Sequence, residues 1–154
     1  MHVKSIVLAF FLLTSLSPKA QDNADSSKLA GTLKELFTIC RTADFKDPRS
    51  YELGLFYKAA PYIVYHGDDK ARDWKDVANY KNEEERKEVD GICERINGTV
   101  NRDQNFRIVQ YLTQKESEGT WHVLVISYDK KGVTKKATFA FLKVGERFAL
   151  GDID

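Results

Sequence analysis

The sequence has few of the side chains that bind metal ions. It contains two cysteines and three histidines, and none of them lie at the short spacings typical of zinc sites. The sequence also shows no phosphate-binding loop and no catalytic motif, so we expect no metal and no cofactor. Cys40 and Cys93 fall on the apolar faces of two predicted helices. They could form one disulfide in an oxidising compartment or remain two buried thiols.

The sequence also lacks an excess of charge of either sign. The chain carries 24 Lys and Arg residues against 23 Asp and Glu residues. Residues 1–20 hold two of the lysines and no acid, so the chain without them would carry 22 basic and 23 acidic residues. Nucleic acids and anionic membranes are usually bound by surfaces with a basic excess. We therefore expect no nucleic-acid partner.

A long, unbroken apolar run occurs near the amino terminus, at residues 6–13. Lys4 precedes the run and a polar stretch, residues 17–20, follows it, which is the pattern of a secretory signal. The run is shorter than the about 20 residues that a membrane-spanning helix needs. The sequence predicts a signal peptide over 1–20, cleaved after Ala20, and a secreted or periplasmic mature chain without a membrane span.

The first half of the remaining chain has the periodicity of helices. After a flexible leader at 21–27, one domain is expected over 28–154. Apolar residues recur at three- and four-residue steps, as on one face of a helix. Three helices are predicted: a first one, a second over 48–61 that Pro61 ends or kinks, and a third over 83–96 capped by Asn82. The stripe of the first helix consists of Leu29, Leu33, Leu36, Phe37 and Cys40.

After residue 105 the apolar pattern alternates with a period of two, as in strands. Four strands are predicted, at 106–112, 121–128, 134–144 and 147–150. Helices that precede a separate antiparallel meander define an α+β fold. We expect three N-terminal helices packed on a curved four-stranded antiparallel sheet. The middle two strands are apolar on both faces, so the sheet needs a second cover: a loop, a ligand or another copy of the chain.

The order of helices before a curved meander, closing on the residues Phe148-Ala149-Leu150-Gly151-Asp152-Ile153-Asp154, resembles the nuclear transport factor 2-like superfamily. This family has a cone-shaped, cystatin-like α+β roll, and the resemblance covers about residues 29–154. It implies a pocket between the concave sheet and the helices, and homodimers through the sheet. Isomerases of the family use a buried aspartate base that faces a tyrosine-containing oxyanion site. We can align no aspartate to that role, so no catalytic residue is carried over. The end of the signal, Lys19-Ala20-Gln21, resembles those of secreted bacterial proteins.

Aromatic side chains gather in the sequence around Pro61 and recur on two strands. Such rings combine apolar faces with hydroxyl donors, so they could line a ligand pocket or simply anchor loops to the core. His122 could act as an acid or base near neutral pH, or be an ordinary strand histidine. Gln110 and Tyr111 lie on opposite faces, so only one of them can join His122. The candidate pocket residues are Tyr57, Tyr62, Tyr65, His66, Trp74, Tyr111 and His122.

These patterns favour a small, exported, non-enzymatic binding module with a small apolar or amphipathic ligand. Two alternatives stay open. The first is a small-molecule enzyme of the same fold, of the isomerase, cyclase or dehydratase kind, with an acid–base residue such as His122. The second is a dimerisation or protein-interaction domain whose pocket is filled by its own side chains. A buried titratable group inside the concave face would favour the enzyme.

Overall fold

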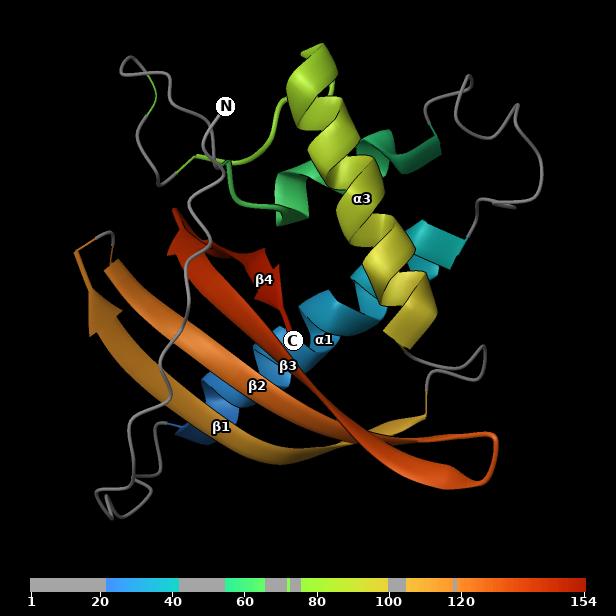
Figure 1. Cartoon of the computed structure of the whole chain (residues 1–154). Coiled ribbons are helices and arrows are strands. Elements are labelled where there is room, and N and C mark those ends of the chain that lie inside the picture. The colour runs from blue at the N-terminus through green and yellow to red at the C-terminus, as the bar shows by residue number, and fades with distance from the viewer. Residues whose placement is uncertain (1–21, 42–54, 66–71, 73–75, 100–104, 118) are drawn as a thin grey trace.

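The computed structural model describes residues 22–41, 55–65, 72, 76–99, 105–117 and 119–154, and has an α+β architecture (Figure 1). Helical elements come first and the sheet follows, as the sequence predicts. The helical elements are α1 (Asp22–Arg41), the 3-10 helices η1 (Leu55–Lys58) and η2 (Ala60–Tyr62), and α3 (Glu83–Thr99). The strands are β1 (Phe106–Glu116), β2 (Gly119–Lys130), β3 (Val133–Val144) and β4 (Arg147–Ile153).

The prediction of three N-terminal helices is wrong in the number and order of helices. Where the second half of the middle helix was expected, the chain makes the two short turns η1 and η2. Proline at position 61 has no N–H group and cannot continue a regular helix. The backbone instead makes hydrogen bonds between residues three positions apart, as in a 3-10 helix. The Ala59 N–H donates to the Phe56 carbonyl and the Tyr62 N–H to the Ala59 carbonyl, both at 2.8 Å. Residues 48–54 of the expected helix lie outside the described residues.

Helix α1 provides the helical side of the core. Its five predicted stripe residues are all fully buried. Phe37 makes edge-on ring contacts with Phe106 of β1 and Phe139 of β3, at centroid distances of 5.7 and 5.8 Å. The helix begins at Asp22, so it includes residues that the sequence assigned to a flexible leader. An acidic residue in the first turn of a helix, here Asp25, favours such an extension because of the positive end of the helix dipole.

The four strands form an antiparallel meander in the order β1-β2-β3-β4. Figure 1 shows α1 crossing one face of the curved sheet, which we call the inner face. Lys131 and Gly132 both have positive φ in the β2–β3 turn, the conformation that two-residue hairpins favour. Register shifts occur at Ile108/Gln110 and at Ala140/Phe141, and such bulges bend a sheet. Five residues of the inner face belong to the main hydrophobic core: Leu124, Ile126, Phe139, Phe141 and Leu150.

The opposite, outer face is covered at one end by the chain itself. Residues after η2 are extended: Ile63 bridges to Leu150 in parallel, and Val64 bridges to Val77. Ile63 points into the main core, whereas Val64 packs in a second cluster with Leu142 and Ala149. The segment 63–65 therefore lies beside β4 and covers part of the outer face of the sheet. Of the three covers expected from the sequence, this one is a loop.

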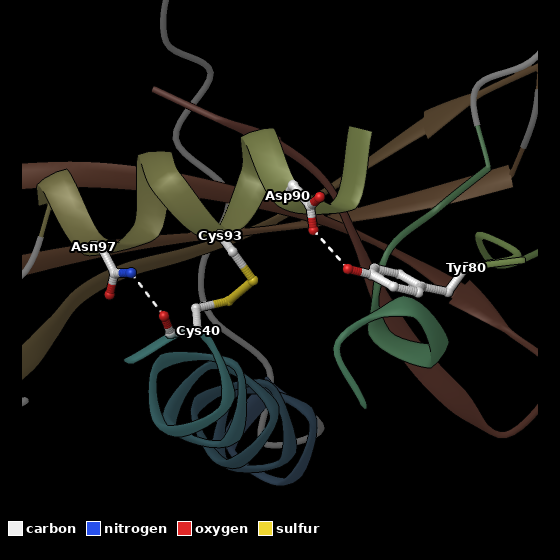
Figure 2. Close-up of a disulfide and its surroundings, with 5 residues drawn as sticks. All are labelled: Cys40, Tyr80, Asp90, Cys93 and Asn97. Carbon is white, nitrogen blue, oxygen red and sulfur yellow. Dashed lines mark hydrogen bonds between the residues drawn. A yellow bond between two sulfur atoms is a disulfide. The ribbon is translucent and has the colours of Figure 1, made fainter. Parts of the chain in front are cut away.

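A disulfide joins α1 to α3, between Cys40 and Cys93, with Cα atoms 4.9 Å apart (Figure 2). Beside it the Asn97 amide donates a hydrogen bond of 2.7 Å to the Cys40 carbonyl. Tyr80 donates one of 2.9 Å to Asp90. The carboxyl-terminal half of α3 is thus fixed to the end of α1 by covalent and polar contacts. None of the described helices is both long and apolar enough to span a membrane.

Candidate functional site

The predicted aromatic group around Pro61 divides into separate environments. Tyr57 is 57% exposed, Tyr65 is buried, and Tyr62 is half-buried. A hydrogen bond to Glu35 of α1, followed by burial, raises the pKa of the Tyr62 hydroxyl. His66 and Trp74, the other two members of the group, lie outside the described residues. The three described tyrosines therefore do not face one common space.

Tyr65 belongs to a polar network that links the chain just before α3, which we call the connector, to the first turn of that helix. The Arg72 guanidinium lies over the Tyr65 ring, 3.9 Å from its centroid. It also donates to Glu85 at 2.6 Å and to Asp76 at 3.0 Å. Glu85 is only 6% exposed and accepts a second bond, of 2.5 Å, from the Asn79 N–H. We call these residues, Tyr65, Arg72, Asp76, Asn79 and Glu85, the connector network.

The connector network is hard to predict from the sequence because Glu85 stands in a run of charged residues. Most of that run is exposed, and Glu83 pairs with Lys87 at 2.8 Å, one helical turn away. Asn82 caps the helix as predicted and accepts from the Glu84 N–H at 2.9 Å. This cap places Glu85 in the first turn, turned toward the connector. The sequence signal for the network is an acidic residue, Glu85, three positions after the capping Asn82, with Arg72 standing 13 residues before it.

The described residues that best form a site are Tyr111 and His122, on neighbouring strands of the inner face. The Tyr111 hydroxyl and His122 Nδ1 are 2.7 Å apart and share a hydrogen bond. The two rings are nearly parallel, and the His122 ring meets the Phe148 ring edge-on at 4.8 Å. His122 is 8% exposed. Of the two candidates on β1, Tyr111 and not Gln110 joins His122, because the bulge after Ile108 sets that register.

Burial lowers the pKa of His122, and the positive charge of Lys143 lowers it further, whereas the negative charge of Asp25 raises it. The imidazole is therefore neutral near pH 7. The charge of Asp25, near the start of α1, therefore acts on this part of the sheet. Among the described residues no buried side-chain nitrogen or oxygen lacks a hydrogen-bond partner.

This arrangement suits recognition through one polar atom among rings. The bond to Tyr111 occupies Nδ1 and fixes the orientation of the imidazole. If the Tyr111 hydroxyl donates to Nδ1, the proton of the neutral ring is on Nε2, and that atom is a donor. The described residues include no group of three His, Cys, Asp or Glu side chains that could hold a metal ion.

No family model matches the chain, and neither the curated proteins nor the solved structures contain a match to it.

Proposed function

We propose that this chain is an exported, non-enzymatic binding module for a small apolar or amphipathic ligand, which contacts Tyr111, His122 and Phe148. The observation that carries the proposal is the hydrogen bond between Tyr111 and His122 on the inner face of the sheet, the face that α1 crosses. A neutral imidazole held among rings offers apolar surface and one oriented polar atom. Binding sites for small organic molecules commonly combine these two features.

Two features support export. The amino-terminal sequence has the pattern of a secretory signal. The chain also holds a disulfide between two fully buried cysteines, and structural disulfides persist mainly in oxidising compartments. A secreted or periplasmic location accounts for both features together.

Membership of the nuclear transport factor 2-like superfamily also remains a proposal. The order of elements supports it, because a first helix crosses the inner face of a later, curved meander. The two short turns η1 and η2 in place of a full second helix depart from the expected arrangement. A ligand placed between α1 and the sheet would occupy the position that the resemblance implies.

One observation favours a second candidate, a small-molecule enzyme. His122 is buried, neutral near pH 7 and located on the inner face, as an acid–base catalyst would be. Such a catalyst would exchange a proton through Nε2 while Tyr111 holds Nδ1. A variant that binds a substrate normally but no longer turns it over would favour this candidate over the binding module.

The binding proposal can be tested with the amphipathic fluorescent probe 1-anilinonaphthalene-8-sulfonate. We expect saturable, one-to-one binding to the folded protein. Tyr111→Phe keeps the ring and removes the hydroxyl, which should weaken binding about fivefold, the equivalent of one hydrogen bond of about 1 kcal/mol. Tyr57→Phe makes the same change on an exposed ring and should have no effect.

His122→Phe should weaken probe binding more than Tyr111→Phe, because it removes both the polar atom and the partner of Tyr111. Circular dichroism of each variant confirms that the fold is retained. If the wild-type protein binds neither this probe nor any member of a small-molecule library, the proposal of a binding module is wrong. The interaction domain with a filled interior then becomes the better hypothesis.

A further inference from the structure

The two edges of the sheet differ in what lies beside them. At one edge, β4 is extended by segment 63–65, through the Ile63 bridge and a 2.9 Å bond from the Val64 N–H to the Leu150 carbonyl. At the other edge, β1 pairs with β2 alone, and no described segment pairs with its far side. An 11-residue strand thus offers a row of backbone donors and acceptors to another strand.

Strand β1 also carries apolar side chains that reach solvent. Ile108, Val109 and Leu112 are 40%, 48% and 38% exposed. They belong to the small set of large hydrophobic residues that are exposed in the described part of the chain. Their concentration on one edge strand indicates an interaction surface, because long apolar edges otherwise promote uncontrolled association.

We propose that β1 pairs antiparallel with β1 of a second copy of this chain, so that two sheets join edge to edge. A two-fold axis requires each residue to meet its symmetry counterpart, and the axis then passes near Leu112. In such a pair, residues directly opposite each other lie on the same face. Leu112 meets Leu112 of the second copy, and Gln110 meets Gln114, all on the outer face.

The bulge in β1 decides how the ends of the strand are matched. Pairing with β2 places Arg107 and Glu116 on the outer face and Lys115 on the inner face, because Val109 stands outside the ladder. Opposite residues must share a face, so Arg107 cannot lie opposite Lys115 of the second copy. It lies opposite Glu116 instead, and the symmetry repeats this pair at the other end.

The strand is therefore complementary in charge to itself when it is paired over its full length. Opposite charges directly across an antiparallel pair are favourable, and like charges are unfavourable. The register that pairs the whole strand is also the register that matches Arg107 with Glu116. Two ion pairs at the ends and an apolar pair at the centre would select this arrangement over slipped ones.

Sedimentation equilibrium of the purified protein tests the proposal. We expect a reversible dimer. Arg107→Glu and Glu116→Arg should each weaken it about tenfold, because each places like charges opposite one another twice in the dimer. The double variant Arg107→Glu/Glu116→Arg should restore wild-type dimerisation, since the charges are exchanged within each pair. Leu112→Lys, which places two lysines at the axis, should leave a folded monomer by circular dichroism.

Lys136→Glu is a matched control, because Lys136 is exposed on β3, across β2 from Arg107. An edge-to-edge dimer should not respond to this change, whereas a dimer formed by stacked outer faces should. The proposal is overturned if the wild-type protein is monomeric at every concentration tested. It is equally overturned if the dimer responds to Lys136→Glu and ignores the β1 variants.

Discussion

The β4 edge and the β1 edge are the two outer strands of one antiparallel meander, but the rest of the chain packs against them differently. Segment 63–65 covers the β4 edge, and the connector network ties the neighbouring residues to α3. The β1 edge has no such cover among the described residues and keeps three exposed apolar side chains. The comparison suggests that the β4 edge serves stability, whereas the β1 edge serves association.

The charges near the two edges support this difference. At the β4 edge, the carboxylate of Glu85 is buried and fully engaged by Arg72 and Asn79. At the β1 edge, Arg107 and Glu116 are exposed at the two ends of the strand. Buried polar contacts stabilise one arrangement of the chain, whereas exposed charges mainly select a partner and a register.

The largest expected effect concerns the disulfide that holds α3 against α1. Cys40→Ala/Cys93→Ala opens a loop closed across 53 residues, which should lower the free energy of unfolding by about 4 kcal/mol. Because α3 carries Glu85 and Arg95, which contact the connector and β4, the β4 edge should loosen most. Urea unfolding gives the free energy, and amide exchange gives the location.

In the disulfide variant, amide exchange should differ between the β4 edge and the middle of the sheet. The Val64 and Ala78 amides, which bond within the covered edge, should exchange faster, while those between β2 and β3 should change least. Equal loss of protection throughout the sheet would contradict a special link between α3 and the β4 edge.

The next largest effect is expected at Glu85. Glu85→Gln keeps the shape of the side chain and removes the charge that faces Arg72. It should cost about 2 kcal/mol, since breaking a largely buried ion pair leaves the arginine poorly compensated. Glu83→Gln removes an exposed acid from the same helical turn and should leave the urea midpoint unchanged. Similar midpoints for the two variants would argue against the connector network.

Much of the fold could be predicted from periodicity. The stripe of α1, the Asn82 cap of α3 and the four-stranded meander all depend on local pattern, and the structure has each of them. The middle helix could not be predicted correctly, because apolar residues at 55 and 56 fit a helix and a 3-10 turn equally well. Pro61, which has no N–H group to donate to a regular helix, lies in the second turn, η2.

The candidate site was predictable only in part, for a reason that lies in the register. Alternation places Tyr111 and Gln110 on opposite faces, but it does not say which one faces His122. The answer depends on the bulge between Ile108 and Gln110, which is a property of the paired strands. Likewise, the burial of Glu85 depends on Arg72, which packs against it from outside the helix. Long-range partners of this kind leave little trace in a local pattern.

The smallest expected effect concerns pH and strand β1. The pKa of His122 is lower in the folded protein than in the unfolded chain, mainly because the ring is buried. The unfolded state therefore binds more protons as the pH falls through about 6.5, the ordinary value for histidine. The contribution of neutral His122 to stability is full above that pH and is lost as the pH falls toward the lowered pKa.

Lowering the pH from 7 to 5 should thus destabilise the wild-type protein more than His122→Phe, which cannot take up the proton. The difference between their urea midpoints should widen steadily over this range. Because Tyr111 bonds to His122 from β1, protonation of Nδ1 should also loosen β1 on β2, and β1 amides should exchange faster. Parallel pH profiles for the two proteins would mean that His122 is as accessible to protons in the folded chain as in the unfolded one, and strand β1 would then owe none of its order to this contact.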